Sequence, residues 1–294
     1  SFVPLFIGFC AAFISGFLAC QWMLNLVRKG KLIWFAVYCL VVGTVVLIYH
    51  FFFFFRMVGG CNIIYKEPGN FQEGALILVD KPLKWTSFDV VNKIRWCLKS
   101  SCGKIKVGHA GTLDPLATGL VVVCTGKWTK QIEMFMAQEK EYVATVRFGA
   151  VTPSFDLETV PEGSFPYAHI DVPYLAGILQ QFTGTITQVP PAYSAIRVNG
   201  DRAYKKARKG SDVEMPVREV FVKELELLEY KAPELVLRID CGKGTYIRSL
   251  ANDIGKACES GAYLAALRRT RIGEFRIEQA NKMDELIAFF QTKM

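Results

Sequence analysis

The stretch of sequence that decides the fold is VGHAGTLDPLATG, residues 107–119. Asp114 stands in it on a turn that glycine and proline punctuate, five residues after His109. The apolar run at 120–124 follows and predicts a short buried strand. An acidic side chain fixed between apolar elements suits attack on a sugar anomeric carbon, or stabilisation of the species formed there. From spacing alone, the alternative is a turn aspartate that hydrogen-bonds to its own backbone.

The segments on either side of this turn predict an α+β fold. Residues 75–79 read as a strand that ends at Asp80-Lys81-Pro82, and Thr86 can cap the amphipathic helix that follows. Because the elements lack βαβ regularity, we expect a largely antiparallel mixed sheet with flanking helices. Further strands are expected at 142–148, 217–229 and 235–241, and helices at 173–182, after Gly242-Lys243-Gly244, and at 283–290.

Charge is distributed unevenly along the 294 residues. Residues 1–56 contain no Asp or Glu and only four basic residues, so they supply half of the net charge of +8. The other 238 residues hold 31 of the 35 Lys and Arg and all 27 Asp and Glu, a mild excess that suits a nucleic-acid partner without requiring one. The nine cysteines form no C-x-x-C pair and predict free thiols in a reducing compartment.

The first 56 residues contain two long apolar runs, 3–27 and 32–55, separated by Arg28-Lys29-Gly30-Lys31. Each run exceeds the roughly 18–20 residues that cross a hydrocarbon core, so we expect a two-span helical hairpin. The alternative is a buried core hairpin. The basic loop would lie in the cytoplasm by the positive-inside rule, which would put everything after Phe55 on the opposite side. Such a topology would separate the rest of the chain from any nucleic acid in the cytoplasm.

Residues 4–48 resemble the C-terminal end of bacterial undecaprenyl-diphosphatases, although they carry no catalytic motif. That resemblance suggests a foreign or fused membrane segment, with Met57 as the first plausible start of the remaining protein. We therefore expect three parts: the hairpin at 1–56, a linker at 57–74, and a catalytic domain at 75–294.

Four further motifs carry candidate functional residues. In GKGTYIRSL, residues 242–250, Arg248 lies near a helix start, where the dipole disfavours a cation unless an anion compensates. Tyr142 lies in Lys140-Glu141-Tyr142, and on alternation alone it is an inward-facing strand residue. Residues 202–210 pack five basic residues around Tyr204, either as a solvated helix face or as a phosphate-binding surface. The last motif is LRRTRIG, residues 267–273.

Together with DKP at 80–82 and QVPPAYSA at 188–195, these motifs resemble those of the TruB family of tRNA pseudouridine synthases, in the same order. The resemblance spans roughly residues 75–275 and implies the pseudouridine synthase fold. It assigns Asp114 as the catalytic carboxylate, Arg248 as the cation that pairs with it and lowers its pKa, and Tyr246 as the group next to the uracil. Tyr142 is expected to stack on the flipped-out base.

The resemblance also implies a substrate-binding set. His109 would lie against the RNA near the flipped base, and Lys81 would support the active-site wall. The basic residues Arg202, Lys205 and Arg208 would contact phosphates. Two features depart from the family pattern: Lys84 stands where glycine is usual, and residues 150–156 lack the T-D-T-x-D sequence, so Asp156 receives no role. We expect no C-terminal PUA domain, since the chain stops soon after the last motif.

The sequence therefore predicts an isomerase that converts the T-loop uridine of tRNA, position 55, to pseudouridine. The T arm of tRNA is the expected partner. No metal, cofactor or protein partner is implied, because uracil is both leaving group and nucleophile. A bacterial cytoplasmic location is expected, with membrane contact only if residues 1–56 are expressed. The alternative is a tRNA-folding chaperone with incidental catalysis, whereas a lipid-carrier phosphatase is disfavoured by the lack of catalytic residues in the hairpin.

Overall fold

A computed structural model describes residues 40, 43, 44, 63–65, 70–194, 196–198, 200–210 and 214–293. The chain divides into two units, Ser1–Arg56 and Met57–Met294, and every element below belongs to the second. The predicted two-span hairpin lies outside the described residues, apart from three isolated positions. Within the part of the chain that the structure describes, no helix is both long enough and apolar enough to cross a membrane.

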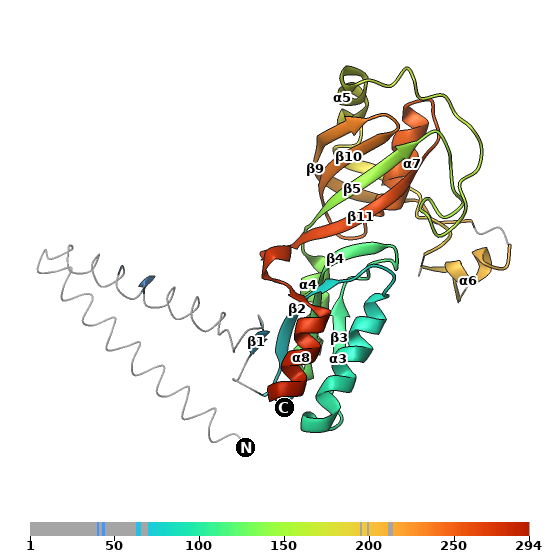
Figure 1. The fold of residues 1–294 in the computed structure, drawn as a ribbon. Coiled ribbons are helices and arrows are strands. Elements are labelled where there is room, and N and C mark those ends of the chain that lie inside the picture. Colours follow the sequence, from blue (N-terminus) through green and yellow to red (C-terminus); the bar gives the residue numbers. More distant parts are fainter. Residues whose placement is uncertain are drawn as a thin grey trace, which may run out of the picture. The chain divides into compact units, whose positions relative to one another are not determined.

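Eleven strands of the described residues form one mixed sheet, in the order β1-β2-β4-β11-β5-β10-β9-β6, with β3, β12 and β13 paired at its sides (Figure 1). Most neighbours are antiparallel, as predicted, but β4 pairs with β11 and β2 pairs with β13 in parallel. The strands are β1 (Ile63–Tyr65), β2 (Ala75–Lys81), β3 (Val107–Ala110), β4 (Ala117–Thr125), β5 (Lys140–Phe148), β6 (Gly184–Gln188), β9 (Arg218–Lys231), β10 (Glu234–Cys241), β11 (Ala262–Ile272), β12 (Phe275–Arg276) and β13 (Asn281–Lys282), while β7 (Arg197–Val198) and β8 (Asp201–Arg202) form a separate ribbon.

Helices cover the sheet in two groups (Figure 1). One group packs against β2 and β3, and the other against β5, β9 and β11. The helices are α3 (Ser87–Cys102), α4 (Ile132–Ala137), α5 (Val172–Gln180), α6 (Ala203–Ala207), α7 (Ile247–Ala257) and α8 (Met283–Lys293), with 3-10 turns η1 (Gly126–Gln131) and η2 (Ile277–Gln279).

Local sequence patterns explain the elements next to the turn that carries Asp114. Thr86 caps α3 as predicted: its hydroxyl accepts from Asp89 N at 3.0 Å, and the Asp89 carboxylate accepts from Thr86 N at 2.8 Å. The alternating side chains Tyr142, Ala144, Val146 and Phe148 are all buried, so the predicted inward face of β5 is confirmed. The helix predicted after Gly244 is α7, and its apolar side chains Ile247, Leu250, Ala251 and Ile254 are buried.

Two elements differ from the sequence-based expectation. Residues 63–65, inside the predicted linker, form β1 and pair with β2. The long strand β11 was not predicted, because its burial does not alternate and its pairing with β5 slips at Leu264/Ala266 and at Arg269/Arg271. Bulges of this kind break the period of two on which strand prediction depends.

Strand β11 matters most for the position of the candidate site. It pairs with β5 along its length and with the start of β4 at Leu267–Ala117, Arg268–Thr118 and Arg269–Gly119. The turn that carries Asp114 immediately precedes β4, so it lies where the two groups of strands meet. Gly119 is required there: its φ is 106°, and an added Cβ would lie 2.3 Å from the carbonyl oxygen of Arg269.

Candidate active site

The Asp114 turn is fixed by hydrogen bonds from the start of α3. The Ser87 hydroxyl accepts from Leu113 N at 2.8 Å and lies 3.2 Å from Leu113 O, to which it can donate. Lys84 N donates to Pro115 O at 2.8 Å, and Lys84 adopts a positive φ of 67° to do so. The departure from glycine at position 84 therefore leaves the turn intact, and the capped helix positions the aspartate.

Arg248 and Asp114 form an ion pair at the start of α7. The Arg248 Nε lies 2.9 Å from Asp114 Oδ2, and the arginine side chain is only 5% exposed against 39% for the aspartate. An arginine in the first turn of a helix is disfavoured by the dipole, and this carboxylate supplies the compensating anion that the sequence called for. The pair therefore presents one face of a carboxylate to solvent while its counter-ion is buried.

The remaining Arg248 donors are also occupied. Nη1 donates to Ser154 O at 3.3 Å and lies 3.6 Å from Asp156 Oδ2, while Nη2 donates to Tyr193 O at 3.1 Å. Asp156, which received no role from the sequence, thus shares the arginine with Asp114. A guanidinium held at all three nitrogens has one orientation, so it fixes the carboxylate it contacts.

The electrostatics of Asp114 differ in part from expectation. Burial raises the pKa of the Asp114 carboxyl above its ordinary value, and the neighbouring carboxylates Asp156 and Glu158 act in the same direction. The Arg248 guanidinium opposes this rise, as predicted, but burial outweighs it. The net direction is therefore upward, where the sequence had predicted a lowered pKa.

The ion pair borders a pocket of about 1010 Å³. Asp114, Tyr142, Tyr246 and Arg248 all line it, so four residues from distant motifs come together. Tyr246 is held by Gln188, whose side chain accepts from Tyr246 N at 2.8 Å and donates to Tyr246 O at 3.0 Å. Burial raises the pKa of the Tyr142 hydroxyl. Two aromatic side chains beside a carboxylate suit the binding of a planar base.

Sequence reasoning missed Arg269, which also lines the pocket. It is 1% exposed, and within the described residues it forms no ion pair. Its Nε donates to Leu120 O at 2.7 Å and its Nη2 to Gly111 O at 3.1 Å. These bonds tie β11 to both ends of the Asp114 turn. The L-R-R-T motif marked the residue, but nothing in its spacing showed that this arginine points inward.

The predicted substrate-binding residues divide into two groups. Lys81 and His109 lie on β2 and β3 and do not line the pocket. The Lys81 ammonium is buried and donates to Trp85 O at 2.6 Å and to Pro82 O, and burial lowers its pKa to about 8. The pKa of His109 is also lowered by burial, and its Nδ1 is buried without a hydrogen-bond partner.

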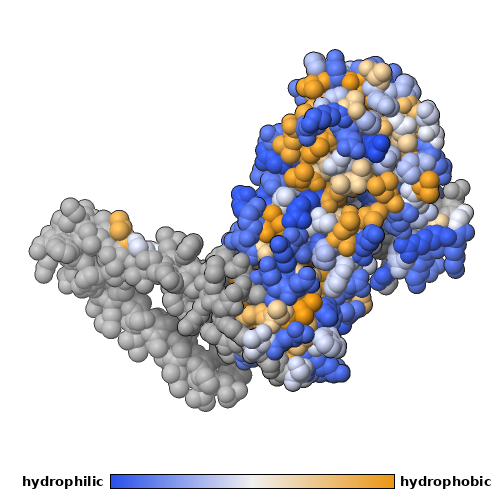
Figure 2. Space-filling model, viewed as in Figure 1, coloured by the Kyte–Doolittle hydropathy of each residue, from blue (hydrophilic) through white to orange (hydrophobic). Residues whose placement is uncertain are grey.

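The basic residues Arg202, Lys205 and Arg208 lie on or beside α6 and are exposed. Figure 2 shows a hydrophilic surface over this helix. Arg208 lines the pocket and pairs with Glu158, with Nη2 2.5 Å from Oε1. The other two do not line the pocket.

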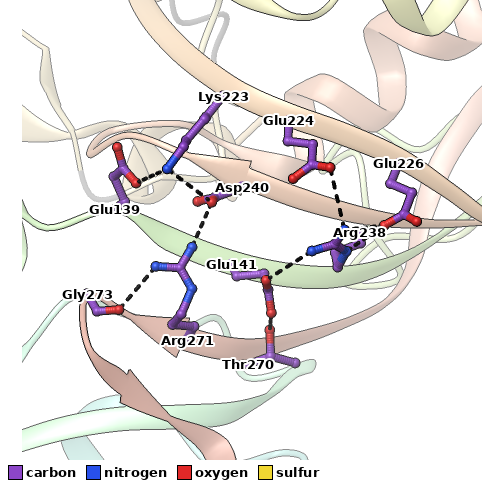
Figure 3. A network of polar contacts seen from close by, with 10 residues as sticks. All are labelled: Glu139, Glu141, Lys223, Glu224, Glu226, Arg238, Asp240, Thr270, Arg271 and Gly273. Carbon is purple, nitrogen blue, oxygen red and sulfur yellow. Dashed lines mark hydrogen bonds and ion pairs between the residues drawn. The ribbon is translucent and has the colours of Figure 1, made fainter.

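A second charged cluster lies on the neighbouring strands β5, β9, β10 and β11, and its residues do not line the pocket (Figure 3). Arg238 contacts Glu224, Glu226 and Glu141, and Glu141 also accepts from Thr270 Oγ1 at 2.7 Å. Asp240 pairs with Arg271 at 2.7 Å. Glu141 directly precedes Tyr142 on β5, so this cluster braces the strand that carries a pocket tyrosine.

Comparison with solved structures defines the class. The chain is similar to the structure of an H/ACA RNP bound to a substrate RNA containing 2'-deoxyuridine (27% identity, TM-score 0.55) and to that of a Cbf5-Nop10-Gar1 complex (29% identity, TM-score 0.57). Each alignment covers about three quarters of this chain, 75% and 76%, but only 54% and 57% of the other. The fold is that of a pseudouridine synthase. The model of the N terminal domain of TruB family pseudouridylate synthase matches residues 99–247, and that of the tRNA pseudouridylate synthase B C-terminal domain matches 248–293. The chain belongs to the TruB family.

Curated relatives agree with the family. The chain is 56% identical over 211 residues to tRNA pseudouridine synthase B of Phocaeicola vulgatus, which covers 71% of this chain and 90% of the relative. It is 48% identical over 216 residues to the protein of that name from Flavobacterium johnsoniae, covering 72% and 94%. Both alignments cover most of the relative.

Proposed function

We propose that the pocket around Asp114 converts a uridine of tRNA to pseudouridine, and that the target is the T-loop uridine at position 55. The isomerase activity follows from the family and from the name shared by its relatives. The observation that carries the site assignment is the Asp114–Arg248 ion pair, 2.9 Å long, beside two pocket tyrosines.

In the proposed reaction the N1–C1′ bond of the nucleotide breaks, uracil rotates, and C5 bonds to C1′. The Asp114 carboxylate acts at C1′ as nucleophile or as the anion that stabilises the species formed there. The C5 proton must then leave, and the freed N1 takes up a proton, so there is no net release of protons. The Tyr246 hydroxyl is the proposed group beside C5. Atoms balance without a cofactor, since uracil is both leaving group and nucleophile.

The other residues of the pocket hold the reactants. Arg248 orients Asp114 and stabilises its ionised form against burial. Tyr142 offers an aromatic face on which a flipped-out base can stack. We further propose that Lys81 supports the active-site wall and that His109 lies near the bound RNA. Arg202, Lys205 and Arg208 would contact phosphates, for which Arg208 must exchange Glu158 for a phosphate oxygen.

The test incubates the full chain with a T-arm stem-loop RNA and maps pseudouridine by carbodiimide-stopped primer extension. A stop is expected at the T-loop uridine with the native sequence, and none with Asp114→Asn. Asp253→Asn, on α7 and outside the pocket, is the matched control and should keep full turnover. Equal turnover by Asp114→Asn, or a stop only at other uridines, would contradict the proposal.

The exposed basic residues around α6 also suit a tRNA-folding chaperone whose catalysis is incidental. That second function predicts that Asp114→Asn keeps tRNA binding and supports growth of cells that lack the enzyme. Loss of growth rescue by a variant that still binds tRNA would reject it.

We also propose that residues 1–56 are a two-span membrane segment distinct from the enzyme and that the catalytic domain lies at 75–294. Residues 57–74 join the two, and residues 63–65 within them pair with the sheet. Support comes from the two apolar runs and from the resemblance of residues 4–48 to undecaprenyl-diphosphatases. A peptide spanning residues 47–63 in the native proteome would show that both parts are translated together. The enzyme's substrate is cytoplasmic tRNA under this proposal.

A further inference from the structure

A basic surface lies outside the pocket, along α3 and the loop that follows it. Between residues 84 and 106 the chain has six Lys or Arg and one acidic residue, Asp89. The net charge of this segment is therefore 6 − 1 = +5, whereas residues 57–294 as a whole have 31 − 27 = +4. The remainder of residues 57–294 thus carries no net positive charge. The basic residues are Lys84, Lys93, Arg95, Lys99, Lys104 and Lys106.

The charges on this surface are not neutralised within the described residues. None of the six takes part in an ion pair there, whereas Arg238, Arg268 and Arg271 elsewhere on the sheet are all paired with carboxylates. The single acidic residue, Asp89, is engaged in the cap with Thr86. A cluster of unpaired cations repels itself, and an anionic partner would relieve that repulsion.

Exposed aromatic side chains accompany these cations. Trp96 is 63% exposed and Phe88 is 58% exposed, although both lie on a helix whose opposite face is buried. Positions 88, 92, 96 and 99 follow helical spacing and share the exposed arc of α3. The Lys93 ammonium lies 4.8 Å from the centroid of the Trp96 ring. Cations interleaved with exposed aromatic rings suit a nucleic acid better than a protein surface.

This surface is continuous with the pocket. Lys84 N donates to the carbonyl of Pro115, a pocket residue, and Ser87 bonds to Leu113 on the same turn. The basic surface therefore begins at the pocket edge. Helix α3 has 16 residues and so extends it by about 24 Å.

We propose that the exposed face of α3, with the loop to Lys106, binds the phosphate backbone of the RNA stem next to the loop in the pocket. This inference rests on the proposed function, because it takes the RNA as the occupant of the pocket. Lysine ammonium groups contact phosphates, and Trp96 and Phe88 pack on sugars. RNA is favoured over an anionic lipid surface because the charges lead directly from the Asp114 turn.

The test compares two double variants with equal loss of charge. Lys93→Gln/Lys99→Gln removes two cations from α3, and Lys231→Gln/Lys256→Gln removes two exposed lysines from the β9–β10 turn and the end of α7. Binding of T-arm RNA is measured at several salt concentrations, in the Asp114→Asn background to prevent turnover. The α3 variant should bind more than about tenfold more weakly near 0.1 M salt, with a log–log salt slope smaller by about 2. The control should match the parent.

Turnover distinguishes this inference from the proposed function. With Asp114 restored, the α3 variant should show raised KM and unchanged kcat, and Trp96→Ala should raise KM alone. If both double variants bind RNA with the parent's affinity and slope while the native chain turns over, the surface does not contact RNA and the inference fails. It also fails if only binding to phosphatidylserine vesicles is reduced. Absence of turnover by the native chain instead rejects the proposed function.

Discussion

Two arginine clusters, one at the start of α7 and one on the strands β5, β9 and β10, differ in burial. Arg248 is 5% exposed and bonds to Asp114, Asp156 and two backbone carbonyls. Arg238 is 37% exposed and contacts three glutamates (Figure 3). The exposed cluster has more carboxylates, yet only the buried one touches the pocket.

The difference shows what each cluster can contribute. Exposed ion pairs are screened by water and contribute about 0–1 kcal/mol each. A buried ion pair gains little net stability, because desolvation offsets the attraction, but removal of one partner leaves a buried charge uncompensated. The role of Arg248 is therefore to orient Asp114 and to keep it ionised. Arg238 contributes modestly to the stability of the sheet.

The largest effect is expected for Arg248. Arg248→Gln leaves Asp114 and Asp156 without their cation, so the free energy of unfolding should fall by about 3–5 kcal/mol. Single-turnover pseudouridine formation should fall more than about 100-fold, since the carboxylate loses its orientation. Denaturant unfolding and rate measurements check both.

Arg248→Lys keeps the charge and sharpens this prediction. It should recover part of the stability but little of the rate, because an ammonium cannot span the four acceptors. Full recovery of the rate would show that charge alone matters.

Much of this buried cluster was predictable from the sequence. The helix-dipole argument required an anion near Arg248, and the motif order identified Asp114 and the two tyrosines that share its pocket. Asp156, Ser154 and Tyr193 were missed as partners of Arg248. They reach it through a carboxylate and two backbone carbonyls of irregular loops, for which no residue pattern exists.

Strand β11 and Arg269 were missed for a related reason. The strand's bulges hide its periodicity, and its inward arginine is satisfied by carbonyls that only the fold brings near. Lys81 and His109 belong to family motifs but do not line the pocket, so their proposed roles rest on the resemblance.

A third arginine, Arg269, is buried but forms no ion pair within the described residues, so it tests the effect of burial alone. Arg269→Lys should keep the charge but lose the bond to Gly111 O, which loosens the Asp114 turn. We expect kcat to fall about 10- to 100-fold and stability by about 1–3 kcal/mol. Arg147→Lys, at an exposed arginine on β5 outside the pocket, is the matched control for kcat. An unchanged kcat in Arg269→Lys would remove its positioning role.

Lys81 extends the comparison to a buried cation without an ion-pair partner in the described residues. Its pKa in the folded protein, about 8, lies below the ordinary lysine value of 10.5. The unfolded chain therefore binds more protons between these values, so stability should rise with pH across this window. Lys81→Met should lack this part of the rise, measured as the difference in Tm from the native chain between pH 7.5 and 10.5. An identical pH profile would place the Lys81 ammonium in water.

The smallest effect is expected for Arg238. Arg238→Gln should lower the free energy of unfolding by less than about 1 kcal/mol, with kcat and KM unchanged, because Arg238 and two of its three partners, Glu224 and Glu226, are open to solvent. The loss should shrink further at high salt. A loss as large as that of Arg248→Gln would break the comparison between the two clusters.

The most direct test of the account is the pH dependence of single-turnover pseudouridine formation in the native chain, Arg248→Gln and Arg238→Gln, below their melting temperatures. The carboxylate is the active form, so the rate should fall as pH drops through the raised pKa of Asp114, above the ordinary value of about 3.9. Loss of the Arg248 charge should move this acid limb upward by about one pH unit or more. Loss of Arg238 should leave it in place. Coincident acid limbs in all three proteins would contradict the claim that Arg248 acts through Asp114.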